Sequence, residues 1–387
     1  VLPLKYEGLN GTELAISESQ ERMAVVIEAH EKEKFIKFCE AENIKAVEVA
    51  KVTDSGRMQM FWNGQKIVDL SRAFLDTSGC AKKQDAKISH LQEVNSNSIE
   101  FNEDNFYKIL AEKNTASQKG LVEMFDSTVG ATTVALPFGG KYQTTETEGC
   151  VQTLPILNAE NIETVSYASW GFDAEISKQN SMVGASLAVV ESVAKIVAMG
   201  GNFRNIRLSF QEYFEKLGNN PEKWGKPLAS LLGAYDAQVN LGLAAIGGKD
   251  SMSGTYQDIN VPPTLISFAC ADGKKLNTIS PEFKKAGNFI YHFHHKTQEN
   301  GLPNYENLIE VFDYIHQGIQ DKKIVSVKTI KDGGVAVAVA KMSFGNILGA
   351  EISIDEKFLL EKNIGGLVIE SSEKLDSDLF QLIGEIK

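Results

Sequence analysis

Gly247-Gly248-Lys249-Asp250-Ser251-Met252-Ser253-Gly254 lies between two apolar runs, residues 239–246 before it and residues 261–271 after it. This pattern predicts two strands joined by a glycine-rich turn. Glycines let backbone N–H groups approach an anion, while Lys249 adds a positive charge and the serines add donors, so the turn suits a phosphate. The spacing is not that of a P-loop. An exposed hairpin turn explains the same residues equally well on spacing alone.

The composition bounds the class of protein. A chain of 387 residues is long enough for two or three domains with their own cores. The net charge of −12 argues against a nucleic-acid partner, and we expect no membrane span because the apolar runs look too short for one. The cysteines are far apart and form no CxxC pair, which predicts reduced thiols of a cytoplasmic protein and neither a zinc site nor a disulfide framework. They are Cys39, Cys80, Cys150 and Cys270.

Residues 1–75 are predicted to form a small α/β unit, with strands at 22–27 and 46–52 and a helix at 32–41. Asn63-Gly64 between two alternating runs is the strongest hairpin signal in the sequence. Residues 76–117 are polar and predict a linker, with a helix that begins after Asn102.

The rest of the chain divides at about residue 276. Residues 118–275 are rich in glycine and in strand-forming residues, and they contain an apolar helix at 184–199 and a second helix at 226–241. Residues 276–387 predict strands at 288–293 and 367–370 and helices at 305–317 and 334–342. Both ends of the chain look like cuts through domains, so we expect an internal fragment.

Six stretches in this order resemble one family, and together they extend along nearly the whole chain. They are "ISESQERM" at 16–23, Asn63-Gly64, "FDSTVG" at 125–130, "GGKDSM" at 247–252, "KDGG" at 331–334 and "NIGG" at 363–366. The family is phosphoribosylformylglycinamidine synthase, the formylglycinamide ribonucleotide amidotransferase of purine biosynthesis, and the Gly-Lys-Asp-Ser-Met form resembles its large, single-chain type.

The resemblance implies a mixed α+β and α/β fold of the aminoimidazole ribonucleotide synthetase type. In it, two units pair as a pseudo-dimer, each with a β-rich A domain and an α/β B domain. Residues 1–75 would then be the C-terminal part of the first B domain and 76–117 a linker with a helix. Residues 118–275 would be the second A domain, with an auxiliary nucleotide site, and 276–387 a second B domain truncated at its C-terminus.

The family's reaction is implied by the same resemblance. The full enzyme is an ATP- and glutamine-dependent ligase with magnesium, in which ATP activates the amide of formylglycinamide ribonucleotide and ammonia from a glutaminase domain displaces phosphate. This chain resembles neither the first A domain nor the glutaminase domain, and no cysteine lies in a nucleophile context. We therefore expect no catalytic residues and an inactive fragment. Its partners would be the N-terminal, first A and glutaminase domains of the same chain.

In the family, the second unit holds a structural ADP with magnesium. The resemblance places one metal ligand at Glu191, and it places residues of other chemistry at the remaining positions. Gly149 and Thr329 stand where the family has aspartates, Lys195 where it has asparagine, and Lys331 where it has a nucleotide-contacting serine. Nucleotide contacts would come from Lys249, Asp250, Ser251 and Lys331.

Magnesium needs several hard oxygen ligands, and only Glu191 remains. Lys195 lies four residues further on the same predicted helix, the better orientation for an ion pair. Our hypothesis is that Lys195 replaces the auxiliary metal and that Mg-ADP no longer binds. The rival hypothesis is that Lys195, Lys249 and Lys331 hold a nucleotide phosphate directly. A simple surface pair is the third interpretation, although the apolar residues around it indicate burial.

Other polar residues have two interpretations each. Ser17, Glu18, Ser19, Gln20 and Arg22 would lie toward the substrate cleft by resemblance, or would set domain packing. His292 and His294 share one strand face, but an incidental strand end explains them better than a metal. The alternative functions are a catalytically silent structural half of the pseudo-dimer and a relative of the aminoimidazole ribonucleotide cyclo-ligase.

Overall fold

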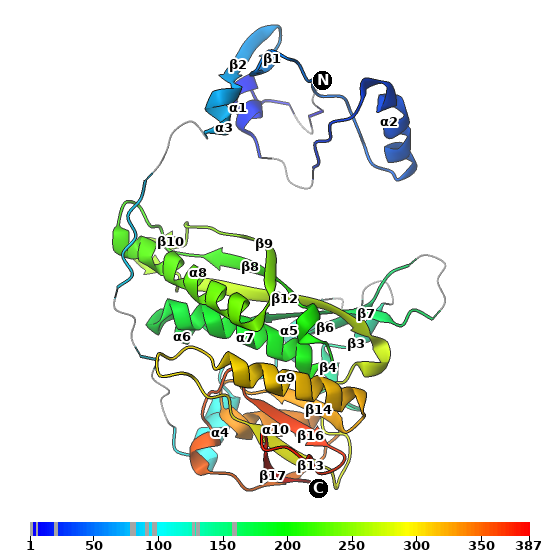
Figure 1. The fold of residues 1–387 in the computed structure, drawn as a ribbon, viewed down its shortest axis with the longest axis vertical. Helices are drawn as coiled ribbons and strands as arrows, with labels where there is room; N and C mark the ends of the chain where they lie inside the picture. The colour runs from blue at the N-terminus through cyan, green and yellow to red at the C-terminus, as the bar shows by residue number, and fades with distance from the viewer. Residues whose placement is uncertain are drawn as a thin grey trace. The chain divides into compact units, whose positions relative to one another are not determined.

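The computed structural model describes most of the chain, namely residues 3–4, 7–18, 22–77, 83–89, 93–94, 99–125, 128, 132–156 and 161–387. The chain forms two compact units, Val1–Lys83 and Gln84–Lys387, which Figure 1 shows in blue to cyan and in cyan to red. Each unit is described by itself below.

The first unit has few elements and almost no core. Its helices are α1 (Gly11–Ile16), a 3-10 turn (Ala29–Glu31), α2 (Lys32–Ala41) and α3 (Arg72–Asp76). Strands β1 (Arg57–Trp62) and β2 (Gln65–Ser71) pair antiparallel around Asn63-Gly64, as predicted. The strands expected at 22–27 and 46–52 are absent from these described residues, and apolar side chains such as Val26 and Val52 remain exposed. An apolar run forms a strand only where it finds a partner edge, and none is present here.

The second unit is built on two sheets. The first has the strand order β3-β6-β7-β12-β8-β9 and is antiparallel except for the parallel pair β8–β9. Its strands are β3 (Thr133–Ala135), β6 (Cys150–Thr153), β7 (Thr164–Gly171), β8 (Arg207–Tyr213), β9 (Ala244–Lys249) and β12 (Thr264–Lys274). Short hairpins add β4 (Phe138–Gly139) with β5 (Thr145–Glu146) and β10 (Thr255–Tyr256) with β11 (Ile259–Asn260).

Helix α7 (Ser181–Ala198) is the centre of the core, packed on one side by strands β7 and β12 and on another by α8 (Pro221–Leu241). The short helix α6 (Ala174–Gln179) precedes it. Among the described residues α7 is the one helix long and apolar enough to cross a membrane, and 94% of it is buried inside the structure. The expectation that apolar runs would be too short was wrong for α7, because a helix covered on all sides has the composition of a membrane span.

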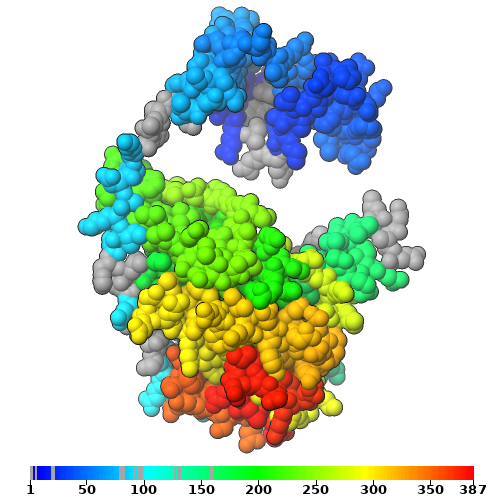
Figure 2. Space-filling model, viewed as in Figure 1, coloured from blue at the N-terminus to red at the C-terminus, as the bar shows by residue number. Residues whose placement is uncertain are grey.

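The second sheet has the order β14-β16-β13-β17-β15. Its strands are β13 (Phe289–Phe293), β14 (Ile324–Thr329), β15 (Ala350–Ile352), β16 (Leu367–Ser371) and β17 (Gln381–Ile386). Helices α9 (Tyr305–Gln320) and α10 (Gly334–Phe344) pack on it, and α9 also contacts α7 and α8. We call residues 132–275 the first half of this unit and residues 276–387 the second half. Figure 2 shows the two halves in continuous contact, green against yellow to red.

Helix α4 (Glu103–Leu110) begins after Asn102, whose side chain accepts a hydrogen bond from Asn105 N, as the capping pattern predicted. Its apolar face packs on α10 through Ile109 and Val337. A single turn, α5 (Lys119–Val122), follows it, and 3-10 turns lie at Phe203–Asn205, Lys275–Asn277 and Glu356–Phe358. The four-part domain division stays a prediction, since the observed boundary between units, at residue 83, lies inside the expected linker.

Candidate functional site

The site lies where the two halves of the second unit meet, and its centre is Glu191 on α7. The Glu191 side chain is 4% exposed, and Lys195, one helical turn further on, is 5% exposed. Lys195 Nζ lies 2.8 Å from Glu191 Oε1. The other carboxylate oxygen, Oε2, accepts a 3.0 Å hydrogen bond from the backbone N–H of Phe172. The interpretation of this pair as a surface pair is therefore wrong.

Lys195 is also held by the end of strand β7. Its ammonium donates to the Trp170 carbonyl at 2.6 Å and lies 4.4 Å from the centroid of the indole ring. Burial and the neighbouring Lys331 lower the pKa of Lys195 to about 8, although Glu191 opposes the shift. A buried ammonium with one hydrogen bond, one ion pair and an aromatic face fills the space beside Glu191.

Lys331, from the second half, gives Glu191 a second ammonium partner. It comes from the segment between β14 and α10, its side chain is 40% exposed, and its Nζ lies 5.3 Å from the Trp170 ring centroid. Burial alone would raise the pKa of Glu191, but Lys195 and Lys331 lower it overall. One carboxylate is thus neutralised by two lysines.

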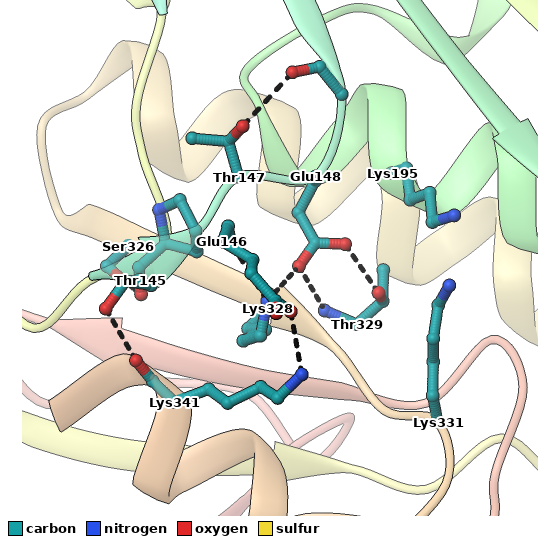
Figure 3. A network of polar contacts seen from close by, with 12 residues as sticks. Thr145, Glu146, Thr147, Glu148, Lys195, Ser326, Lys328, Thr329, Lys331 and Lys341 are labelled. Carbon is teal, nitrogen blue, oxygen red and sulfur yellow. Dashed lines mark hydrogen bonds and ion pairs between the residues drawn. The ribbon is translucent and has the colours of Figure 1, made fainter. Parts of the chain in front are cut away.

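A second buried carboxylate, Glu148, was missed by the sequence analysis. Figure 3 shows it between the halves, reaching toward Lys328 and Thr329 on strand β14. Glu148 lies 2.8 Å from Lys328 Nζ, and Thr329 Oγ1 donates to Glu148 Oε2 at 2.5 Å. Burial opposes ionisation, yet Lys328 and Thr329 lower the pKa of Glu148. Its neighbour Gly149 drew attention only because it replaces a family aspartate.

The backbone explains why residue 149 is glycine. A Cβ there would collide with the carbonyl of Ala168 and would press on the Met199 side chain. An aspartate cannot occupy this position without a shift of strand β6 or β7. Among the described residues no group of three or more His, Cys, Asp or Glu side chains could hold a metal ion. Magnesium therefore does not fit this site, since two lysines neutralise Glu191 and Lys328 and Thr329 bind Glu148.

Two further ion pairs cross the boundary, and in both the lysine belongs to the second half and the carboxylate to the first. Lys341 on α10 pairs with Glu146 at 2.7 Å (Figure 3). Lys362 bridges Asp173 of the first half and Asp332 of its own half, at 2.5 and 2.7 Å. Lysines 328, 331, 341 and 362 of the second half thus all reach carboxylates of the first. The boundary is closed by charge as well as by apolar packing.

The glycine-rich stretch differs from its prediction. Gly247, Gly248 and Lys249 are the end of strand β9, and the apolar run before them holds the end of helix α8 and the start of strand β9. Lys249 pairs with Gln211 on β8, and Ser251 N–H donates to the Glu212 carbonyl at 3.1 Å. Strand β9 is three strands from β7, about 14 Å at the usual spacing. The structure therefore does not bring Lys249, Asp250 and Ser251 to Lys331, and their nucleotide role stays a prediction.

The glycine pairs of the second half are packed against protein. A Cβ at Gly333 would meet Val337 and Ile109, one at Gly334 would meet the backbone of 359–361, and one at Gly365 would meet His295 and Val190. Gly333, Gly334 and Gly365 also have positive φ. Tight packing explains these glycines.

The predicted substrate-side loop is only partly described. Ser17, Glu18 and Arg22 are exposed in the first unit, and Ser19 and Gln20 lie outside the described residues, as does Cys80. His292 is buried and His294 packs 4.6 Å from the Phe358 ring. Burial lowers the pKa of His292 to about 4, so this side chain is a neutral core residue, as the strand-end interpretation expected.

Comparisons with known proteins give the relationship. The family described as "AIR synthase related protein, C-terminal domain" matches residues 1–63. Phosphoribosylformylglycinamidine synthase subunit PurL of Carboxydothermus hydrogenoformans is 22% identical over 99% of this chain and 54% of its own length. This chain is a relative of phosphoribosylformylglycinamidine synthase. The same subunit of Thermoplasma acidophilum is 24% identical over 91% of this chain and 48% of its own length.

Solved structures show the same fold. The PurLQS structure from Thermotoga maritima matches all of this chain and 58% of that chain, with a TM-score of 0.71 and 18% identity. T. maritima PurL complexed with ADP matches with a TM-score of 0.69 and 18% identity. The predicted synthetase-type architecture is confirmed. The chain spans about half the length of the phosphoribosylformylglycinamidine synthase relatives that it matches, and the large single-chain type stays a prediction.

Proposed function

We propose that this chain is part of an enzyme that converts formylglycinamide ribonucleotide to the amidine in purine biosynthesis, with ATP and magnesium and with ammonia from glutamine. The support is the similarity of nearly the whole chain to about half of the synthase subunits and of the PurL structures complexed with ATP, ADP and AMPPCP. Its partners would be the missing synthase domains and a glutaminase, in the cytoplasm. The PurLQS structure of a relative supports an assembly of this kind.

Within that enzyme, this chain supplies a structural half. One observation carries the proposal: Lys195 and Lys331 neutralise Glu191, at the position where the family resemblance implies a metal-bound nucleotide. Both ammonium groups belong to the protein itself, so the positive charge that neutralises Glu191 at the boundary between the halves is always present. The chain itself carries out no step of the reaction.

The outer face of the first sheet fits this role. Trp170 and Phe268 are paired across strands β7 and β12 on the face opposite α7, and they are 51% and 44% exposed. Tyr213 lies on the same face of β8, opposite Thr264, and is 37% exposed. Large apolar groups on a sheet face need a cover. We propose that the sheet of the catalytic A domain covers them.

The test is the ligand content of the purified chain, with nucleotide released by acid and metal measured alongside. We expect neither ADP nor magnesium at stoichiometric amounts. Stoichiometric Mg-ADP would overturn the structural role. ADP without metal would favour the rival in which the lysines hold phosphate, and Lys331→Ser should then release the nucleotide.

Activity is the second measurement. The chain mixed with formylglycinamide ribonucleotide, ATP, magnesium and ammonium chloride should form no amidine and no phosphate above the background without protein. Turnover by this chain alone, abolished in Glu191→Gln, would contradict the assignment of a non-catalytic half.

A further inference from the structure

One cavity of the second unit is lined by residues of the linker and the first half, away from the boundary between the two halves. It has a volume of about 400 Å³ and opens between the first turns of α7 and α8, beside residues 88–89 of the linker. The residues that line it include Lys178, Lys223, Lys226, Ser177, Ser181 and Glu215. None of the sequence motifs draws attention to it.

The cavity is positive in a strongly negative chain. Its wall holds three ammonium groups against the two carboxylates of Glu215 and Glu222, while the whole chain has a net charge of −12. The N-terminal ends of two long helices, of 18 and 21 residues, also point their positive dipoles here. Charge of this sign favours an anionic ligand.

Buried hydroxyl groups give independent support. Ser177 is 4% exposed and Ser181 is 6% exposed, and both line the cavity. Neither hydroxyl has a hydrogen-bond partner among the residues that the structure describes. Neither oxygen is among the fully buried side-chain atoms without a partner, so both hydroxyls are open to the cavity and can donate to a ligand that accepts hydrogen bonds.

The lysines keep donors for such a ligand. Glu215 is 5% exposed and binds Lys226 at 2.5 Å and Lys223 at 2.7 Å. Lys178 binds only the exposed Glu175, at 2.7 Å. An ammonium group has three N–H donors, so at least one donor remains on each lysine. Glu215 holds two of the ammonium groups at the wall and does not exhaust them.

We propose that this cavity binds a phosphate group, either as inorganic phosphate or as the monoester of a small sugar phosphate. Lys178, Lys223 and Lys226 would bind the phosphate oxygens and Ser181 would donate its hydroxyl. A phosphate monoester offers several acceptor oxygens and close to two negative charges, which matches three lysines and two hydroxyls. The site is independent of Glu191 and of the role proposed for the chain.

The test is calorimetric titration of the full 387-residue chain with inorganic phosphate and with ribose 5-phosphate at one fixed ionic strength. We expect saturable binding of one ligand per chain. Tighter binding of ribose 5-phosphate would identify a sugar phosphate as the ligand, and equal binding would identify phosphate alone. No heat from either ligand at millimolar concentration would overturn the proposal.

The variant Lys178→Gln/Ser181→Ala tests the location, because neither change removes a partner of buried Glu215. We expect affinity for both ligands to fall at least about tenfold. Lys274→Gln, an exposed lysine of β12, is the matched control and should bind as the parent does. Lys226→Arg keeps the pair with Glu215 and should also bind. An equal loss of affinity in Lys274→Gln would show that phosphate binds non-specifically to surface lysines. Unchanged affinity in the double variant would show that phosphate binds elsewhere. Either result would overturn the proposal.

Discussion

Glu191 and Glu212 are both buried carboxylates of the first half, 3% and 6% exposed, and their pKa values move in opposite directions. Glu191 meets two lysines, and its pKa is lowered in spite of burial. Glu212 lies at the end of β8, and no ion pair with a lysine is found for it among the residues that the structure describes. Burial, and then the charge of Asp250, raise its pKa to about 7. The difference shows that a carboxylate at the boundary between the halves meets lysines that neutralise it, whereas Glu212 within one half does not.

Glu148 extends the comparison within the boundary. It has one lysine and one threonine, where Glu191 has two lysines and a backbone N–H. Loss of its lysine should therefore leave Glu148 with no ammonium in direct contact, whereas Glu191 should keep one. The two buried carboxylates thus differ in the number of lysines that neutralise them. Single and double lysine substitutions measure this difference.

Lys328→Met should have the largest effect. It removes the ammonium that contacts Glu148, and a buried carboxylate that has lost its ion-pair partner destabilises a protein by about 3–5 kcal/mol. Urea denaturation at neutral pH, followed by circular dichroism, gives the free energy of unfolding. In a Glu148→Gln background the same substitution should have less than half of this effect. An equal loss in both backgrounds would show that the lysine acts through packing alone.

Lys195→Met should destabilise less, by about 1–3 kcal/mol, because Lys331 still neutralises Glu191. Methionine keeps most of the apolar contact with Trp170, so the charge is the main change. Combining it with Lys331→Met should then reproduce the loss seen for Lys328→Met. If the single substitution already equals the double one in urea denaturation, Lys331 gives Glu191 no protection.

Helices and strands that pack against other elements of the second unit could be predicted from the sequence. The run at 184–199 became α7, and the cap at Asn102 begins α4 as predicted. The helix expected at 226–241 begins earlier, at Pro221 after the cap Asn220. The runs at 22–27 and 46–52 have the same apolar character, yet no strand forms there. Strand propensity depends on a neighbouring strand, and the sequence does not show whether that neighbour is present.

Only part of the candidate site could be predicted, because some of its contacts are local in sequence and others join distant residues. Glu191 and Lys195 are four residues apart, and helix periodicity alone pairs them. Glu148 and Lys328 are 180 residues apart in the chain, so no local pattern joins them. The resemblance pointed to Gly149, one residue away from the carboxylate that matters. A buried ion pair between distant strands becomes visible only when the sheets are placed.

Glu212→Gln should change the pH dependence of stability. The pKa of Glu212 is about 7 in the folded protein against an ordinary 4.5, so the folded state holds this proton more tightly. Its contribution is fully present below the ordinary value and is lost as pH rises through about 7. The parent should therefore lose about 1–2 kcal/mol relative to the variant between about pH 5 and pH 8. Parallel stability curves would show that Glu212 is ionised or solvated throughout.

Lys341→Met should have the smallest effect, because its partner Glu146 is 27% exposed and water can replace the lost ammonium. We expect about 1 kcal/mol or less in urea denaturation, close to the value for surface pairs. Salt separates the two classes of pair, since it screens exposed charges more than buried ones. Adding about 0.5 M sodium chloride should reduce the coupling of Lys341 with Glu146 and leave that of Lys328 with Glu148 nearly unchanged. Equal screening of both couplings would mean that water reaches Glu148 as well, and the boundary would then not be closed around its lysines.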